Sequence, residues 1–342
     1  MSKIKTVSAI GLDIGSYSIK CVEVLRSGTS IQLNRASILP LADSSPATLA
    51  ATLKLILNLP PQSPLRGLRI SVSGSSLLIR RISMPAMTSA ELKSAIRFEA
   101  EGHIPFPIDD CVLDFQIINQ EETKKTMNVL LVAAKKDFIQ DRIKVLSDLN
   151  LQPEIIDVDI FCLINAFEML GELPTQEHAY GLLNIGHKGS SFAIMQGNVP
   201  FFVREIPFGG LSISKALAEI RGIKEDEADT LKSSRDEAHL AQLKAATQKG
   251  FEPLIEELKH SLDYYENEAG EELRSIRLSG GGALAYGATD VLAEELGKQI
   301  ILWDNTKKMK IFGDIDLKFL SEHSSELNVA LGMVLRGLGH NK

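Results

Sequence analysis

Residues 10–20 read Ile-Gly-Leu-Asp-Ile-Gly-Ser-Tyr-Ser-Ile-Lys, and this stretch decides the fold. Its apolar residues predict a buried strand that ends at Gly15 and Ser16, followed from Ser18 by the return strand of a tight hairpin. Such a turn can wrap a phosphate group. Gly15 lets the backbone approach a ligand closely, and its neighbours, Tyr17 included, offer amide and hydroxyl groups.

Asp13 stands just before this bend, where its carboxylate could hold a hydrated Mg²⁺ ion that faces the phosphates. An ordinary hairpin with one acidic residue near its tip would show the same pattern. A second copy favours phosphate binding, because residues 182–194 read Leu-Leu-Asn-Ile-Gly-His-Lys-Gly-Ser-Ser-Phe-Ala-Ile. Two such hairpins predict two related half-domains that face each other across a cleft, each holding a nucleotide's phosphates from one side.

A third glycine-rich stretch fits the same cleft. Residues 277–283 read Arg-Leu-Ser-Gly-Gly-Gly-Ala, which predicts a strand end, a turn of three glycines and a helix from Ala283 to about Leu296. Glycines at such a turn let a flat base or an α-phosphate lie against the backbone. One glycine turn alone is weak support, so the order and spacing of all three carry the prediction.

With these motifs the sequence resembles the actin-like ATPase superfamily. Residues 13–20 resemble its first phosphate motif, residues 184–191 its second phosphate motif, and residues 278–283 its adenosine motif. Longer stretches resemble the family of the type IV pilus assembly protein PilM, which is related to the cell-division protein FtsA. These stretches are residues 84–107, 204–210, 227–232 and 329–337.

The resemblance implies an α/β chain with an actin-like two-domain fold, in which duplicated ribonuclease-H-like halves carry an inserted subdomain of the FtsA and PilM type. We expect the first actin-like domain to comprise residues 1–83, 153–178 and 326–342. The other expected parts are the inserted α/β subdomain at 84–152, the second actin-like domain at 179–210 and 275–325, and a helical subdomain at 211–274.

The resemblance also implies ATP or ADP as the ligand, with Mg²⁺ held by Asp13 through water. The expected cofactor-binding residues are Asp13, Gly15, Ser16, Tyr17, Ser18, Lys20, Asn184, Gly186, His187, Lys188, Gly209, Gly210, Asp229, Lys232, Gly280, Gly281, Gly282 and Ala283. Lys20 resembles the family's phosphate-facing lysine, while an exposed strand lysine is the default interpretation. Asp229 and Lys232 lie one helical turn apart and could face the ribose and the base.

Asn184 is the most informative departure from the superfamily, which usually carries aspartate at this place. An amide cannot act as a base and holds a cation poorly, so nucleotide binding could survive while efficient hydrolysis would not. His187 could contribute a proton-transfer group, although a solvated loop histidine is the more ordinary interpretation. No residue stands out in the sequence as a catalytic base.

Composition excludes several classes of protein. The chain has 342 residues, 44% of them hydrophobic, which is enough for two domains with proper cores. A net charge of −7 without a basic tract argues against nucleic acid and anionic lipid as partners. No apolar run approaches the roughly 20 residues of a membrane span, and residues 1–5 do not resemble a signal peptide. We expect a cytoplasmic protein whose three cysteines are buried thiols, without a structural metal.

Hydrophobic periodicity and breaker residues predict the remaining elements. Strands are expected at residues 31–39, 68–72, 77–82, 112–118, 127–134, 154–159 and 201–206. Helices are expected at residues 46–57, 88–101, 136–149, 160–169 and 329–338, and across most of 211–270. The apolar stripe within residues 251–267 is expected to be core, and Pro60, Pro61 and Pro64 to mark an exposed connection.

Residues 97–107 combine a helix end, a proline-fixed turn and two phenylalanines, a mixture suited to holding a short extended peptide. In the PilM family the corresponding region helps form a groove for the cytoplasmic N-terminal tail of the membrane protein PilN. We therefore expect a partner tail to contact Arg97 and the turn of Ile104, Pro105, Phe106 and Pro107. Phe98 and Phe106 could instead pack the core of the insert.

The favoured function is an ATP-binding cytoplasmic scaffold of the type IV pilus inner-membrane platform, with weak or no ATP hydrolysis. A PilN-like tail would hold it at the inner membrane, and other platform proteins and the pilus motor ATPase would be indirect partners. Self-association into a homo-oligomer stays open, whereas nucleic acid and direct membrane insertion are not expected. The alternatives are a small-molecule kinase acting on a sugar or carboxylate, and an FtsA-like filament former. The insert argues against a kinase, because actin and the sugar kinases have none at this place.

Overall fold

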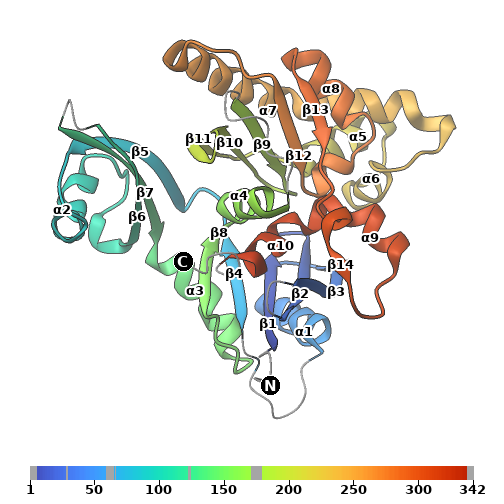
Figure 1. Cartoon of the computed structure of the whole chain (residues 1–342). Helices are drawn as coiled ribbons and strands as arrows, with labels where there is room; N and C mark the ends of the chain where they lie inside the picture. The colour runs from blue at the N-terminus through green and yellow to red at the C-terminus, as the bar shows by residue number, and fades with distance from the viewer. Residues whose placement is uncertain are drawn as a thin grey trace.

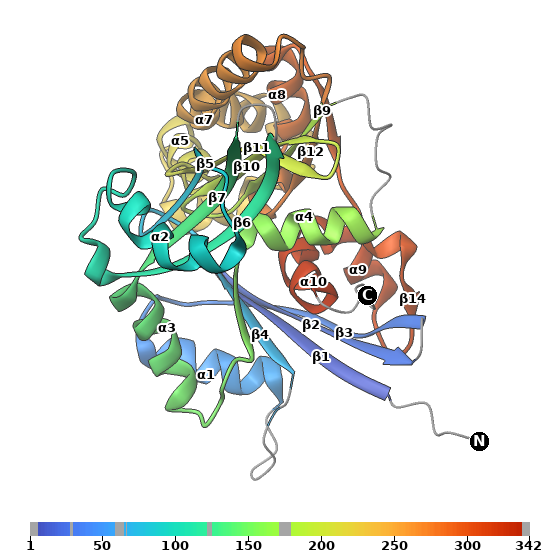
Figure 2. The ribbon, with the colours of Figure 1, turned by 60° about the vertical axis from the view of Figure 1, so that its left-hand side comes forward.

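The computed structural model describes residues 6–27, 30–58, 65, 67–121, 125–170 and 179–336. These residues form β-sheets of six, five and three strands. The two larger sheets belong to two halves stacked one above the other, and helices α4 (Asp159–Leu170) and α10 (Asn328–Leu335) lie between them (Figure 1). The three-stranded sheet projects to one side of both halves (Figure 1), and this side faces the viewer in Figure 2. The chain therefore has the two-half α/β architecture that the sequence predicts.

The six-stranded sheet forms the first half, with strand order β14-β3-β2-β1-β4-β8. Its strands are β1 (Thr6–Ile14), β2 (Ser18–Ser27), β3 (Ser30–Pro40), β4 (Leu68–Val72), β8 (Ile155–Val158) and β14 (Lys310–Ile311). Strand β2 runs antiparallel to both of its neighbours, β1 and β3. Strands β4 and β8 run parallel to β1. Helix α1 (Pro46–Leu57) packs Leu53 against Leu12 on one face, and α10 packs against Val22 on the other.

The helices α4 and α10 connect the two halves through close packing. A Cβ atom at Gly332 would lie 1.7 Å from the carbonyl oxygen of Cys162, so only glycine permits this approach. The other side of α4 packs Phe167 against Tyr180 and Trp303 of the second half. Helix α4 therefore belongs to the cores of both halves and fixes their relative position.

The five-stranded sheet forms the second half, with strand order β11-β10-β9-β12-β13. Its strands are β9 (Ala179–Ile185), β10 (Ser190–Gln196), β11 (Val199–Ile206), β12 (Ser275–Ser279) and β13 (Gln299–Leu302). Its main helices are α5 (Gly210–Arg221), α6 (Glu225–Leu231), α7 (Leu240–Ala269) and α8 (Ala288–Leu296). The apolar stripe on α7 is buried against this sheet, which confirms its assignment to the core.

The three-stranded sheet has the order β5-β7-β6, with β5 (Leu77–Pro85), β6 (Cys111–Glu121) and β7 (Thr126–Lys135). Helix α2 (Ser89–Glu101) packs Leu92 and Ile96 on one face of it. The expected capping box is present, since Thr88 accepts from the Glu91 amide and Glu91 accepts from the Thr88 amide. The helix-strand-strand pattern of the insert is therefore confirmed.

Helix α3 (Lys136–Ser147) packs on the first half. Its Leu146 packs in the same core as Leu12 and Leu53, so the helix covers the first half beside α1. Strand β7 ends at Lys135 and α3 begins at the next residue, so no loop separates the insert from this helix. The domain boundaries, including the end of the insert at residue 152, stay predictions.

A second difference concerns the helix expected from Ala283 to Leu296. A 3₁₀ turn at Gly281–Leu284 and a break at Gly287 precede α8, because Gly287 adopts a left-handed conformation with φ of 75°. The last helix ends at Leu335, and a short helix α9 (Leu317–His323) precedes it. The expected connections at 60–64 and 171–177 lie outside the described residues, as do residues 122–124 of the loop at 120–125.

The structure settles two further points of chain chemistry. Cys21, Cys111 and Cys162 are buried free thiols, as predicted. Among the residues that the structure describes, no helix is both long enough and apolar enough to cross a membrane.

Candidate functional site

A cavity of about 420 Å³ lies between the two halves, within the size range of small-molecule sites. Its walls include many of the predicted cofactor residues, namely Asp13, Gly15, Ser16, Tyr17, Lys20, Asn184, Gly186, His187, Lys188, Gly280 and Gly281. The other predicted cofactor residues do not line it; they are Ser18, Gly209, Gly210, Asp229, Lys232, Gly282 and Ala283. The cavity thus unites all three glycine-rich motifs.

The two hairpins present matching turns to this cavity. The Gly15 amide donates to the Ser18 carbonyl at 3.1 Å, and the Gly186 amide donates to the Gly189 carbonyl at 2.9 Å. Within the described part of the chain, the two amides that follow Gly15 and the two that follow Gly186 donate no hydrogen bond. Each turn therefore keeps backbone donors available for an anionic ligand.

The two hairpins differ in the residues that begin them. Asp13 lies opposite Lys20 in the first hairpin, and the Lys20 Nζ is 3.2 Å from its carboxylate. Asn184 lies opposite Ser191 in the second, so no ion pair forms there. The Lys20 side chain is only 15% exposed and lines the cavity, which favours the phosphate-facing assignment over an ordinary surface lysine.

The third glycine turn packs directly on the second hairpin. A Cβ atom at Gly280, whose φ is 90°, would lie 2.3 Å from the Ile185 carbonyl oxygen. A Cβ atom at Gly282 would lie 2.4 Å from the Ile185 side chain, and one at Gly209 would lie 2.5 Å from the Gly186 carbonyl oxygen. All three glycines are required for packing around the hairpin, whereas the sequence pattern of Gly280 and Gly282 had suggested contact with a base or an α-phosphate.

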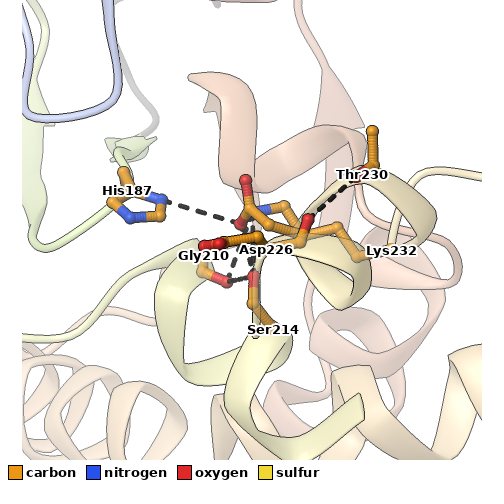
Figure 3. A network of polar contacts seen from close by, with 7 residues as sticks. His187, Gly210, Ser214, Asp226, Thr230 and Lys232 are labelled. Atoms are coloured by element: carbon orange, nitrogen blue, oxygen red, sulfur yellow. Dashed lines mark hydrogen bonds and ion pairs between the residues drawn. The ribbon is translucent and has the colours of Figure 1, made fainter. Parts of the chain in front are cut away.

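A polar network lies just behind the second hairpin (Figure 3). One carboxylate oxygen of Asp229, Oδ1, accepts from the Lys232 Nζ and from the Ser214 hydroxyl, both at 2.5 Å. Its second oxygen, Oδ2, is buried without a hydrogen-bond partner in the described structure. Burial raises the pKa of Asp229, but the bonds from Lys232 and Ser214 outweigh it, and the pKa lies below its usual value.

An aromatic contact joins the two hairpins across the cavity. The rings of Tyr17 and His187 stack with centroids 4.9 Å apart and planes inclined by 28°. His187 Nδ1 lies 3.8 Å from the Asp229 carboxylate, and its side chain is only 15% exposed, so it is not the solvated loop residue that its context suggested. Burial and the charge of Lys232 lower the pKa of His187, which favours the neutral ring.

The structure adds acidic residues that the sequence did not single out. Asp159, the first residue of α4, lines the cavity, and burial together with the charge of Asp13 raises its pKa to about 6. Glu205 at the end of β11 faces it from the other half, and burial raises its pKa to about 7. The Glu205 carboxylate accepts from the Gly74 amide at 2.9 Å, a bond that joins the halves. Asp159 is therefore a candidate for the catalytic base that could not be identified from the sequence.

Two more charged side chains reach the cavity from distant segments. Arg142 comes from α3, and Glu326 comes from the segment before α10. The carboxylate of Glu326 forms a hydrogen bond with His323 Nδ1 at 2.7 Å. A Cβ atom at Gly281 would lie 2.9 Å from the same carboxylate. In the sequence, Arg142 could have been noticed because it is an arginine within the apolar stripe of its helix. Asp159 had the signal of a carboxylate at a strand end.

The charges of the cavity suit a nucleotide that brings its own cation. Among the residues that line it there are four carboxylates, Asp13, Asp159, Glu205 and Glu326, and three basic side chains, Lys20, Arg142 and Lys188. A polyphosphate would lie close to these carboxylates, and a bound Mg²⁺ ion would reduce the repulsion between the two sets of negative charges. No group of three metal-ligating side chains occurs in the described segments.

The residues predicted to bind a partner lie together on the insert. Arg97 pairs with Asp109, and the Phe106 ring lies half-buried beneath the Lys135 Nζ at 4.5 Å from its centroid. The side chain of Ile104 packs in the core of the insert, so it cannot itself contact a partner without rearrangement. Phe98 is 80% exposed on α2, which removes the interpretation that it packs the core.

Two facing hairpins, a glycine turn and two connecting helices around one cavity define the actin-like fold, and solved structures of similar proteins agree. The family model of the type IV pilus assembly protein PilM matches residues 11–338, and the chain belongs to this family. A solved PilM-PilN type IV pilus biogenesis complex is similar with a TM-score of 0.82 and 25% identity, covering 98% of this chain and 99% of that chain.

A more distant likeness shows how widely the fold extends. The ethanolamine utilization protein EutJ from Carboxydothermus hydrogenoformans is similar with a TM-score of 0.53 and 14% identity. The match covers 97% of this chain and 90% of that chain, so it includes both halves. At this identity the likeness concerns the fold alone.

Proposed function

We propose that this chain is a nucleotide-binding scaffold of the type IV pilus assembly platform. The observation that carries the nucleotide assignment is the pair of matched turns, each with two amides that have no hydrogen bond in the described structure and that border one cavity. Phosphate oxygens are the ligands that such amides bind. Membership of the PilM family supports the role in pilus assembly.

Mg²⁺ would enter this site with the nucleotide, held by Asp13 through water. The carboxylate of Asp13 is 3.2 Å from the Lys20 Nζ, so a phosphate could take over Lys20 while metal-bound water takes the carboxylate. The metal would neutralise phosphate charge beside the four carboxylates of the cavity. We therefore expect nucleotide affinity to depend on Mg²⁺.

Hydrolysis of the nucleotide would be slow in this scheme. Asn184 cannot accept a proton, and it stands where the second hairpin begins. Asp159 is the carboxylate suited to accept a proton from water, because its pKa of about 6 lies near the pH of the cytoplasm. Residual turnover would then depend on Asp159, and Asn184 would limit its rate.

A PilN-like tail is the proposed partner, and two observations support it. The solved complex to which this chain is similar contains PilM together with PilN, and the insert exposes 80% of the Phe98 side chain on α2. An exposed phenylalanine beside the proline-fixed turn and Arg97 supplies an apolar anchor with polar neighbours. We propose that the tail contacts Arg97, Phe98 and the turn of residues 105–107.

The nucleotide assignment is tested by calorimetry with Mg·ADP and Mg·ATP. Unmodified protein should bind both, and Asp13→Ala should weaken binding in the presence of Mg²⁺ more than in EDTA. Asp114→Ala, which removes an exposed carboxylate from the insert, serves as the control. Equal affinity of the unmodified protein and Asp13→Ala at saturating Mg²⁺ would remove Asp13 from the site.

The partner assignment is tested by binding a synthetic PilN N-terminal peptide. Phe98→Asp should weaken binding by tenfold or more if Phe98 fills a pocket, since a buried aromatic anchor contributes about 2 kcal/mol or more. Leu55→Asp is the matched control, because Leu55 is 73% exposed on α1, away from the insert. Equal binding by both variants would place the tail elsewhere.

A small-molecule kinase remains the second candidate because Asp159 provides the carboxylate that such an enzyme needs. A kinase would consume ATP faster when its substrate is present. ATP consumption that a panel of sugars and carboxylates leaves unchanged would exclude this function, and sedimentation with and without ATP would test for filaments.

A further inference from the structure

Arg142 is the half-buried basic side chain of the cavity for which the described part of the chain offers no partner. Arg142 lines the cavity, yet within the described part of the chain its guanidinium makes no hydrogen bond or ion pair. Lys20, by contrast, pairs with Asp13. Burial lowers the pKa of Arg142, and the charges of Asp159 and Asp13 only partly offset this effect. A half-buried guanidinium without hydrogen bonds is unfavourable, so its position calls for an anionic ligand.

The direction of Arg142 follows from its place on α3. Ile139, Arg142 and Leu146 occur at a spacing of three and four residues, so they share one face of the helix. Ile139 and Leu146 both pack against hydrophobic cores. The packing that anchors α3 to the first half therefore also directs Arg142 inward, to the cavity.

Contacts divide the charged residues of the site between its two halves. Lys232 pairs with Asp229, Asp229 lies near His187, and His187 stacks on Tyr17, all close to the second hairpin. On the first half, Lys20 pairs with Asp13, and Arg142 lines the same cavity from α3. Arg142 and Lys232 therefore belong to opposite halves of the site.

We infer that Arg142 binds the terminal phosphate of a nucleoside triphosphate and makes this site prefer triphosphate over diphosphate. The inference rests on the proposed nucleotide function. If the nucleoside lies toward Asp229 and Lys232, the two matched turns hold the inner phosphates of either nucleotide, and only a third phosphate extends to Arg142. A guanidinium can donate two parallel hydrogen bonds to one phosphate, which gives both strength and direction.

The test compares Mg·ADP with Mg·AMP-PNP, a triphosphate analogue that resists hydrolysis, by calorimetry on the full chain. Arg142→Met keeps much of the apolar stem and removes the charge. It should weaken AMP-PNP binding by about ten- to a hundredfold, the value of hydrogen bonds to a charged group, and change ADP binding by less than about twofold. Arg142→Lys should recover part of the loss. Lys144→Met, an exposed residue on the same helix, should match unmodified protein.

Several outcomes would overturn the inference. Equal weakening of ADP and AMP-PNP by Arg142→Met would give the residue a general role in shaping the site, and unchanged AMP-PNP binding would give it none. Arg142→Gln serves as a second variant if Arg142→Met unfolds at a lower temperature than unmodified protein. If unmodified protein binds neither nucleotide, the proposed function fails together with this inference. If it binds both and Arg142 does not discriminate between them, only this inference fails.

Discussion

Glu205 offers a test of the contact between the two halves, because its charged form is disfavoured in the folded protein. One carboxylate oxygen accepts from the Gly74 amide at 2.9 Å, while the other, Oε1, is buried without a hydrogen-bond partner in the described structure. Burial and the nearby charge of Asp159 raise the pKa of Glu205 from 4.5 to about 7. The substitution Glu205→Gln removes the charge and keeps an acceptor for Gly74.

The size and sign of the effect follow from this pKa. One pKa unit corresponds to about 1.4 kcal/mol, so the shift corresponds to a penalty of about 3 kcal/mol for the ionised side chain. Because the folded-state pKa of this acid is raised, the penalty is absent below pH 4.5, grows as the pH rises and is complete above about pH 7. Glu205→Gln should therefore raise the free energy of unfolding by up to about 3 kcal/mol at pH 8 and hardly change it at pH 4.5.

Urea unfolding of both proteins between pH 4.5 and pH 8.5 measures this difference. The midpoint of Glu205→Gln should rise relative to unmodified protein as the pH increases through 5 to 7. Glu256→Gln on α7 is the control, because that exposed side chain lies outside the cavity and should shift the midpoint little at any pH. A gain at pH 8 no larger than the gain at pH 4.5 would refute the reasoning.

Three further predictions concern turnover, access and packing. Asn184→Asp should raise phosphate release from ATP, and Asp159→Asn should abolish residual release; fast release by unmodified protein would contradict this scheme. Tyr17→Ser should speed association of a fluorescent nucleotide by roughly two- to tenfold, because it removes the stack of Tyr17 on His187 across the cavity, worth about 0.5–1.5 kcal/mol. Slower association would make Tyr17 a ligand contact instead. Gly332→Ala should destabilise the protein by about 3 kcal/mol or more, because its Cβ would lie 1.7 Å from the Cys162 carbonyl oxygen; an unchanged thermal midpoint would contradict the close packing of α4 and α10.

The parts of the fold that depend on local sequence were predictable. The helix expected at residues 46–57 has those bounds in the structure, and β4 matches its expected range of 68–72. Both hairpins were visible because each combines apolar strands with an Ile-Gly turn. The capping box at Thr88 and Glu91 likewise needs only four consecutive residues. In each case the interactions that fix the element join residues close together in the chain.

The electrostatics of the cavity were not predictable in the same way. Asp159, Glu205 and Arg142 come from three segments that meet only after the halves pack together. Arg142 and Asp159 carry only a weak signal in their own segments, and the significance of all three side chains depends on burial and on charges contributed by the others. The pairing of Lys232 with Asp229 behind the second hairpin also depends on tertiary packing, which no local spacing specifies.

The insert and the cavity are mechanically joined at two places. Gly74, whose amide donates to Glu205, also accepts from the Leu77 amide at the start of β5, and β7 continues into α3 and so to Arg142. A backbone bond from Lys135 to Ser76 ties these two ends of the insert together at 3.0 Å. A partner that displaces the insert must therefore move two walls of the cavity at once. If nucleotide and partner each favour one position of the insert, each must change the affinity of the other by the same factor.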